Sequence, residues 1–382
     1  MTMTIDRTKI LKTFSGILIA AVIVIVIVIV SRPQQTSPEI QQTFNQIAPS
    51  KPTTLFFAGD IMLSRNVDQE ILKANNPNLP FLNVASQVQQ ADIAFANLES
   101  QFAQNAIRAR QGLVFGAHPD VARGLSFAGF DVLSTANNHS LDYGIESLEY
   151  TIDLLNQYNI QASGTKKPAT EHAAAIIEKN GIVFGFLSYS YAAHNDGGPP
   201  AGEAGRSTHT QISDFNNLDR LRQDILDIKG HYADIVIVSM HAGAEYTREP
   251  NQKQIDFAHG AIDAGADLVI GHHPHWIQTI EQYQGKWIFY SLGNFVFDQM
   301  WSIDTREGLT VTITMTMPPT NVGEPRPSEI GGTMTGPEIK KIELKPVIID
   351  NYCCPRWATE TETLAILGKL GLTSVILLDK ND

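Results

Sequence analysis

Short apolar runs alternate with amphipathic stretches along most of this chain, and this alternation constrains the fold more than any other feature. Runs of strand length are followed repeatedly by stretches with helical periodicity. This order is typical of an α/β fold. The expected strands are 54–58, 93–97, 132–136, 173–178, 182–189, 235–241, 268–270, 286–291, 309–317 and 339–349, and the expected helices are 66–74, 121–128, 145–158, 215–229, 252–264 and 361–370.

Polar side chains gather where these apolar runs stop. That edge is where open α/β sheets bind their ligands. Taken singly, an Asp or Asn at such a position is commonly a turn or cap residue, and a His there is often a hydrogen-bonded core residue. Three imidazoles within four positions are instead typical of metal binding. The strand-end residues are Asp60, Glu99, Asn138, His241 and the triplet His272, His273 and His275.

Together these residues offer carboxylate, amide and imidazole ligands. That mixture suits a pair of divalent ions such as Mn, Zn or Fe. Two such ions lower the pKa of a bridging water and stabilise charge on a phosphoryl or carbonyl oxygen. His139 follows Asn138 directly and is placed to protonate a leaving group as a general acid. The sequence therefore predicts a hydrolase-like metal site with His139 as its catalytic residue.

The N-terminal region carries a long uncharged segment. Residues 13–31 form 19 uncharged positions, which as a helix would measure about 28 Å and span a bilayer core. A buried strand is the alternative, but 19 residues exceed strand length. Three basic residues precede the segment and no small-residue cleavage site follows it, so we expect a signal anchor with residues 1–12 in the cytoplasm. Residues 32–52, rich in Pro and Gln, read as a linker to an extracytoplasmic domain.

Charge and cysteine content exclude several classes of protein. Lys and Arg number 28 against 40 Asp and Glu, giving a formal charge of −12, so we expect no nucleic acid partner. The same charge repels a polyanion at long range, and an anionic ligand would have to be drawn in by metal. The cysteines, Cys353 and Cys354, are adjacent and can close only a strained bridge, which excludes a disulfide framework and a Cys-based zinc site.

Further residues near the strand ends have more than one interpretation. Arg65 would clamp a carboxylate or phosphate, or would form a surface ion pair. Glu245 and Tyr246 would line the cleft and bind substrate, or would belong to an ordinary loop. Gly293 and Asn294 follow a strand and are expected to form a turn, and the alternative for Asn294 is a hydrogen bond to a metal ligand.

In these motifs the sequence resembles the CapA family of capsule, or poly-γ-glutamate, biosynthesis proteins. The resemblance covers about residues 53–358 and rests on six blocks in order. They are Gly59 to Arg65, Asn97 to Glu99, Ala136 to Gly144, His241 to Tyr246, Gly271 to Gln278, and Tyr290 to Phe295. That family is similar to the calcineurin-like metallophosphoesterases. The resemblance therefore implies a four-layer αββα sandwich of metallophosphoesterase type with a two-metal site.

The resemblance also implies roles for single residues. Asp60 matches the first metal aspartate, and Glu99 stands where the phosphoesterases have a bridging carboxylate. Asn138 and His139 match an Asn-His pair, His241 matches the next histidine ligand, and His273 with His275 match the final His-x-His, for which His272 is an alternative to His273. Met62 stands where the phosphoesterases place a histidine, and Ala242 replaces an aromatic residue.

From these observations we expect a membrane-anchored protein that faces the periplasm or cell surface. It would serve the synthesis, release or export of an anionic envelope polymer, through a metal-dependent hydrolase site that cleaves phosphoesters or amides. The alternative is a non-catalytic subunit that binds polymer or membrane synthase subunits, which Met62 favours. Residues 53–358 would form the domain, and residues 359–382 a helix that packs on it or trails behind it.

Overall fold

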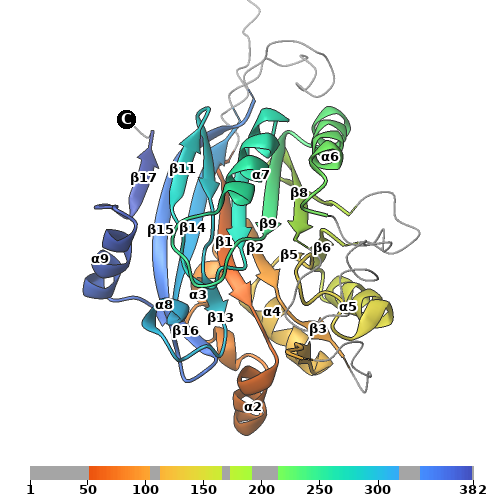
Figure 1. Cartoon of the computed structure of the whole chain (residues 1–382), viewed down its shortest axis with the longest axis vertical. Coiled ribbons are helices and arrows are strands. Elements are labelled where there is room, and N and C mark those ends of the chain that lie inside the picture. The colour runs from red at the N-terminus through yellow and green to blue at the C-terminus, as the bar shows by residue number, and fades with distance from the viewer. Residues whose placement is uncertain (1–50, 104–111, 166–172, 192–213, 318–335, 381–382) are drawn as a thin grey trace, which may run out of the picture. The chain divides into compact units, whose positions relative to one another are not determined.

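Two β-sheets form the centre of the computed structural model, which describes residues 51–103, 112–165, 173–191, 214–317 and 336–380 (Figure 1). The first sheet is mixed and has nine strands. Its order is β16 (Cys354–Trp357), β15 (Glu338–Asp350), β14 (Glu307–Thr316), β1 (Thr53–Ile61), β2 (Ile93–Leu98), β5 (Val132–Ser134) and β6 (Gln161–Ser163), with β13 (Asn294–Val296) paired to β1 and β17 (Ile376–Asp379) paired to β15.

The second sheet has six strands and contains a parallel core. Its order is β11 (Ile280–Tyr283), β12 (Lys286–Phe289), β10 (Leu268–His272), β9 (Ile235–His241), β8 (Ile182–Ser190) and β7 (Ala175–Lys179). A separate parallel pair joins β3 (Gln101–Phe102) to β4 (Gly116–Ala117).

Alternate residues of the strands face different layers, because successive side chains point to opposite sides of a sheet. Phe57 and Phe95 of the first sheet pack into one core with Phe186 and Ile237 of the second, and the rings of Phe95 and Phe186 stack 5.5 Å apart. The intervening residues face helices instead. Those against the first sheet are α2 (Arg65–Ala74), α3 (Ala85–Val88), α4 (Ala122–Ala128) and α5 (Gly144–Gln157), and those against the second are α6 (Leu218–His231) and α7 (Gln252–Asp263).

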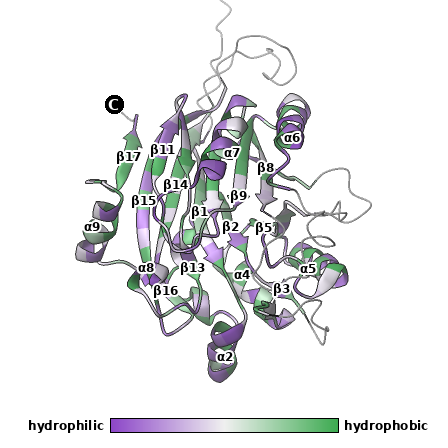
Figure 2. Cartoon of the chain, in the orientation of Figure 1, coloured by the Kyte–Doolittle hydropathy of each residue, from purple (hydrophilic) through white to green (hydrophobic). Residues whose placement is uncertain are grey.

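These contacts confirm the α/β class and arrange the described residues in four layers, helix, sheet, sheet, helix. Hydropathy follows the same order: hydrophobic colour concentrates on the central strands β1, β8 and β9, and α2 and α6 are largely hydrophilic (Figure 2). Helices and strands longer than six residues lie close to the ranges that periodicity predicts. The strands that it misses, among them β6, β13 and β17, have only two to four residues and carry too little pattern to detect.

The turn expected at Gly293 and Asn294 is wrong for Asn294. This residue begins β13, which pairs in parallel with β1 in the register Asp60 to Asn294. Gly293 has a φ of 67°, which glycine adopts without a steric penalty, and its carbonyl accepts the Asp60 amide at 3.0 Å. The local signal of a turn was therefore overridden by pairing with a distant strand.

The C-terminal segment is part of the first sheet and of the core. Helix α9 (Glu360–Lys369) buries Ile366 and Leu367 between the two sheets, and β17 then pairs with β15. Residues 359–380 therefore complete the domain rather than trail behind it. In the β15–β16 turn, Cys353 and Cys354 are joined in a disulfide.

The expected anchor at 13–31, the cytoplasmic segment 1–12 and residues 32–50 of the expected linker lie outside the described residues. Of the helices in the described ranges, none has the length and apolar character needed to cross a bilayer. The short helix α8 (Ile303–Arg306) lies between β13 and β14.

Candidate metal centre

The carboxyl ends of the parallel strands bring the predicted ligands together from both sheets. Strands β1 and β2 pair Asp60 with Asn97, and Glu99 follows directly after β2. In the second sheet, β9 and β10 pair His241 with His272. The centre therefore draws carboxylates from the first sheet and imidazoles from the second.

Asp60 is fully buried and is held by two hydrogen bonds. The Asn97 Nδ2 group donates to Oδ1 at 2.8 Å, and the His273 backbone N–H donates to Oδ2 at 3.1 Å. Burial by itself would raise the pKa of Asp60, but the neighbouring His272, His241 and His275 hold it below its ordinary value. Asp60 is thus fixed as a carboxylate, the form that binds a cation.

In the part of the chain that the structure describes, the buried carboxylate of Glu99 has no group beside it that offsets the cost of its desolvation. Neither of its carboxylate oxygens has a hydrogen-bond partner among the described residues, although an unpaired buried carboxylate is costly. The closest basic atoms are Nε2 of His139 and Nε2 of His241, each 3.8 Å from Oε1. Burial, together with the nearby charges of Asp60 and Glu245, raises the pKa of Glu99. A bound cation would satisfy both oxygens, so this residue fits a metal ligand.

Two sets of donor atoms share Glu99. One set is Glu99, His241 and His273, the other is Asp60, Glu99 and His275, and within each set the donor atoms lie within 4.8 Å of one another. Two adjacent sets with a common carboxylate are what a bridged pair of ions requires. The donors present therefore fit divalent metal binding.

Two of the candidate histidine ligands, His241 and His273, are neutral. Burial lowers the pKa of both His241 and His273, that of His273 to about 3. A neutral imidazole is the form that coordinates a metal ion. The Asn138 Oδ1 atom lies 2.7 Å from Nε2 of His241, which places the Asn138 amide at the same donor set.

The structure distinguishes the two alternatives in the histidine triplet. His273 belongs to one donor set, whereas His272 belongs to neither. The His272 side chain is completely buried below the centre, with Nδ1 3.4 Å from Asp60 Oδ1. His273 and His275 have φ angles of 99° and 57°, a backbone conformation that non-glycine residues seldom adopt and that is common at functional sites.

Met62 is not a ligand in this structure. Its side chain is completely buried in the core between the first sheet and its helices. The Sδ atom accepts hydrogen bonds from the Ser64 hydroxyl at 3.0 Å and from the Ser64 backbone N–H at 3.2 Å. Met62 thus contributes to packing here.

The His139 ring is held by a carboxylate and an aromatic ring. Its Nδ1 lies 2.7 Å from Asp142 Oδ2, and its ring stacks on Phe115 with centroids 3.7 Å apart. The Phe115 backbone N–H donates to the same Asp142 oxygen at 2.6 Å. This arrangement leaves Nε2 directed at Glu99, at 3.8 Å. The imidazole is therefore positioned beside the centre by a carboxylate and an aromatic face.

Arg65, Glu245 and Tyr246 lie around this core. Arg65 pairs with buried Asp298 at 3.2 Å, and its guanidinium lies 5.5 Å from the Phe115 ring centroid. The Tyr246 ring stacks over His275 at 5.9 Å, and its hydroxyl accepts from Gln299 at 3.2 Å. Glu245 is close enough to raise the pKa of Glu99.

Several residues at the centre were not predicted as site residues. Asn97 and Asp142 orient Asp60 and His139, and the Asn294 Oδ1 atom lies 3.0 Å from Nδ1 of His275. One signal was available for Asn97, because it precedes Glu99 by two positions and strand residues two apart share a face. The contact of Asn294 with His275 agrees with the alternative to a turn that the sequence offered for this residue. Asp142 carries no such signal, since its partners are set by tertiary contacts.

Comparison with known proteins gives consistent matches. The model of the bacterial capsule synthesis protein family PGA_cap matches residues 54–299. The PGA biosynthesis protein CapA of Bacillus subtilis is 30% identical over 76% of this chain and 74% of its own length. The capsule biosynthesis protein CapA of Bacillus anthracis is 32% identical over 65% of this chain and 61% of its own length. Among solved structures, a phosphatase from Mycoplasma pneumoniae shows 11% identity and a TM-score of 0.44 over 84% of this chain and 99% of that chain.

Proposed function

The chain belongs to the bacterial capsule synthesis protein family, and from this membership we propose that it acts in the synthesis, release or export of an anionic envelope polymer of the poly-γ-glutamate type. The polymer class is inferred from the names of the two Bacillus relatives, which are a PGA biosynthesis protein and a capsule biosynthesis protein. The proposal also includes a metal-dependent hydrolase site of the metallophosphoesterase type.

The shared, uncompensated carboxylate of Glu99 is the observation that carries the hydrolase proposal. Its two buried oxygens lie between two donor sets, which would hold two divalent ions such as Mn, Zn or Fe. When bound, such ions lower the pKa of a coordinated water and stabilise negative charge on a phosphoryl or carbonyl oxygen. The ligands would be Asp60, Glu99, Asn138, His241, His273 and His275.

The surrounding residues would bind and protonate the substrate. His139 would donate the proton on Nε2 to the leaving group, while Asp142 accepts the hydrogen bond from Nδ1 and keeps the ring in place. Arg65 would bind a carboxylate or phosphate group of the substrate, because its ion pair with Asp298 uses only part of its donor set. Glu245 and Tyr246 would line the side of the cleft next to His275.

A second candidate function is polymer binding without catalysis. Met62 favours it, because this buried side chain leaves one donor set without the histidine of the phosphoesterases. In this version the same residues hold metal and a polymer carboxylate, and no bond is cleaved. Membrane synthase subunits would then be the partners of the protein.

Membrane attachment is part of the proposal. Residues 13–31 would anchor the chain with residues 1–12 in the cytoplasm, and the metal centre would then face the periplasm or the cell surface. The uncharged length of the segment and the basic residues before it support this orientation.

The test is metal content and hydrolysis measured on the full-length chain. We expect about two equivalents of divalent metal and cleavage of phosphoester or amide substrates that stops on chelation. Asp60→Asn should lose both, whereas Asp92→Asn should keep both. Asp92 is a partly buried carboxylate that accepts hydrogen bonds from the Thr54 backbone N–H and hydroxyl at the other end of β1. Metal without cleavage of either substrate class would support the binding function, and absence of metal would contradict both functions.

A further inference from the structure

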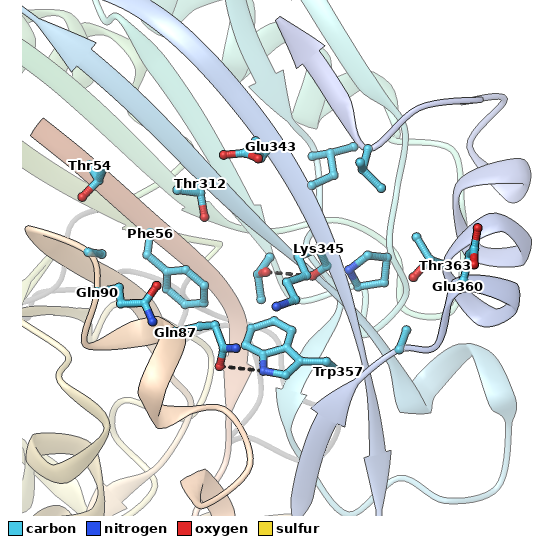
Figure 3. A pocket seen from close by; sticks show the side chains of 16 residues that line it. Thr54, Phe56, Gln87, Gln90, Thr312, Glu343, Lys345, Trp357, Glu360 and Thr363 are labelled. Carbon is cyan, nitrogen blue, oxygen red and sulfur yellow. Dashed lines mark hydrogen bonds between the residues drawn. The ribbon is translucent and has the colours of Figure 1, made fainter. Parts of the chain in front are cut away.

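A groove of about 610 Å³ lies on the first sheet, away from the metal centre. It is formed by β14, β15 and β1 with the end of β16, and it is bordered by α3 and α9 (Figure 3). Thr54 lines it and precedes Asp60 by six residues on β1, which is about 20 Å along a strand. Its volume is that of a site for a drug-sized ligand.

A lysine without a carboxylate partner among the described residues lines this groove. The Lys345 Nζ atom is 4.0 Å from the centroid of the Trp357 ring, and in the described ranges it has no carboxylate within ion-pairing distance. The Lys345 residue is exposed at the groove, and partial desolvation lowers the pKa of its ammonium group. The indole is held in turn, because Trp357 Nε1 donates to Gln87 Oε1 at 2.8 Å. The ammonium and the ring are therefore arranged before any ligand arrives.

The other charges of the groove do not neutralise Lys345. Glu343 is paired with Lys341 at 2.9 Å. Glu360 lies on α9, on the other side of β15 from Lys345 and Trp357 (Figure 3). The Lys345 end of the groove is therefore positive, although the whole chain is acidic.

Neutral hydrogen-bonding groups complete this end. The side chains of Gln90 and Thr312 line the groove and have no hydrogen-bond partner within the part of the chain that the structure describes. An amide and a hydroxyl both donate and accept, which suits the N–H and C=O groups of an amide-linked chain. Trp357 adds an apolar surface for methylene groups.

We infer that this groove binds a short stretch of an amide-linked chain that carries carboxylates, with one carboxylate on Lys345, methylene groups on Trp357 and amide groups on Gln90 and Thr312. A neutral saccharide would leave the Lys345 ammonium unpaired. The inference rests on the proposed function for the identity of the polymer, but the groove itself is separate from the metal centre. A chain of several residues bound here would be kept near the centre without occupying it.

Calorimetric titration of the full-length chain with a γ-linked glutamate octamer tests the inference. We expect Lys345→Met to weaken binding at least about tenfold, since the hydrogen bond to a charged group is lost, while Lys345→Arg keeps most of the affinity. Lys253→Met is the matched control, because Lys253 lies 5.1 Å from the Tyr191 ring centroid on another face. It should bind the octamer as the wild type does.

A second probe is the same octamer with its carboxylates converted into amides, which should bind at least about tenfold more weakly than the acid form. When Lys345→Met is introduced into the Asp60→Asn variant, whose metal centre is disabled, it should weaken octamer binding by the same factor as in the wild type, which separates this inference from the proposed function. Equal affinity for the two octamers, unchanged affinity in Lys345→Met, or no binding to the wild type would overturn the inference. Thermal unfolding of each variant shows whether it is folded.

Discussion

At the scale of single residues, His139 depends on a carboxylate three positions away. Asp142 holds the imidazole through Nδ1, so Asp142→Asn should lower kcat by about 10²- to 10⁴-fold and change KM little. Steady-state kinetics on the hydrolysed substrate measure this split. Asp142→Glu, which keeps the charge, should recover part of kcat.

A matched histidine and carboxylate pair serves as the control. His259 Nε2 lies 3.1 Å from Glu281 Oε1, and this pair is far along the chain from His139. Glu281→Gln should leave kcat unchanged. A similar loss in both variants would show that the Asp142 effect is general destabilisation rather than positioning of His139.

At the scale of secondary-structure elements, two glycines allow strands to approach each other just before the ligands. A Cβ atom at Gly59 would overlap the Gly293 carbonyl, and one at Gly271 would overlap the Tyr290 carbonyl. Gly271→Ala should therefore reduce the free energy of unfolding by about 2 kcal/mol or more, measured by urea denaturation.

Gly260→Ala is the control for this substitution. Gly260 lies in α7 and a Cβ there would meet no neighbouring atom, so this variant should gain up to about 1 kcal/mol from the better helix propensity of alanine. If both alanines had the same effect, close strand approach would not explain Gly271.

The C-terminal helix α9 provides a pH-dependent contact. Glu362 closes the capping box with Thr359 and accepts two hydrogen bonds of 2.8 Å from Arg356. Hydrogen bonds from Arg356 lower the pKa of Glu362 from 4.5 to about 2. Because the folded-state pKa is the lower one, the stabilisation is complete above about pH 4.5 and is lost as the pH falls toward 2.

Glu362→Gln should accordingly be less stable than the wild type at pH 7 and approach it at pH 2 to 3. The pair is about one-third exposed, so solvent screens it and the difference at pH 7 should not exceed about 1 kcal/mol. Denaturant unfolding at several pH values measures it. A difference that stays constant from pH 7 to pH 2 would contradict the assignment to Glu362.

At the scale of the described domain, the metal centre joins the two sheets. Asp60 and Glu99 come from the first sheet and His241, His273 and His275 from the second. A ligand that binds only the folded chain stabilises it, so chelation should lower Tm by about 5 to 10 °C. Glu99→Gln should lose this response and Glu281→Gln should keep it. An equal response in all three proteins would place the metal elsewhere.

Periodicity predicted the long elements and the strand-end residues because both are local patterns. Asp60, Glu99 and His241 each follow an apolar run, and parallel strands present their carboxyl ends at one edge. Asp142 could not be predicted in the same way, and the role of Asn294 was only an alternative to a turn. Asp142 is defined by contacts with His139 and Phe115, and Asn294 begins a three-residue strand whose pairing with β1 spans more than 200 positions.

The amino-acid sequence by itself determined the α/β class, the family resemblance and the set of residues able to bind metal, since these depend on residue type and local spacing. Only the tertiary structure decided that two donor sets share Glu99, that His273 rather than His272 belongs to one of them, and that Met62 is a core residue. It also brought Lys345, Trp357 and Gln90 to one groove. These features are distances between residues far apart in the chain, and they are set by how the two sheets and their helices pack.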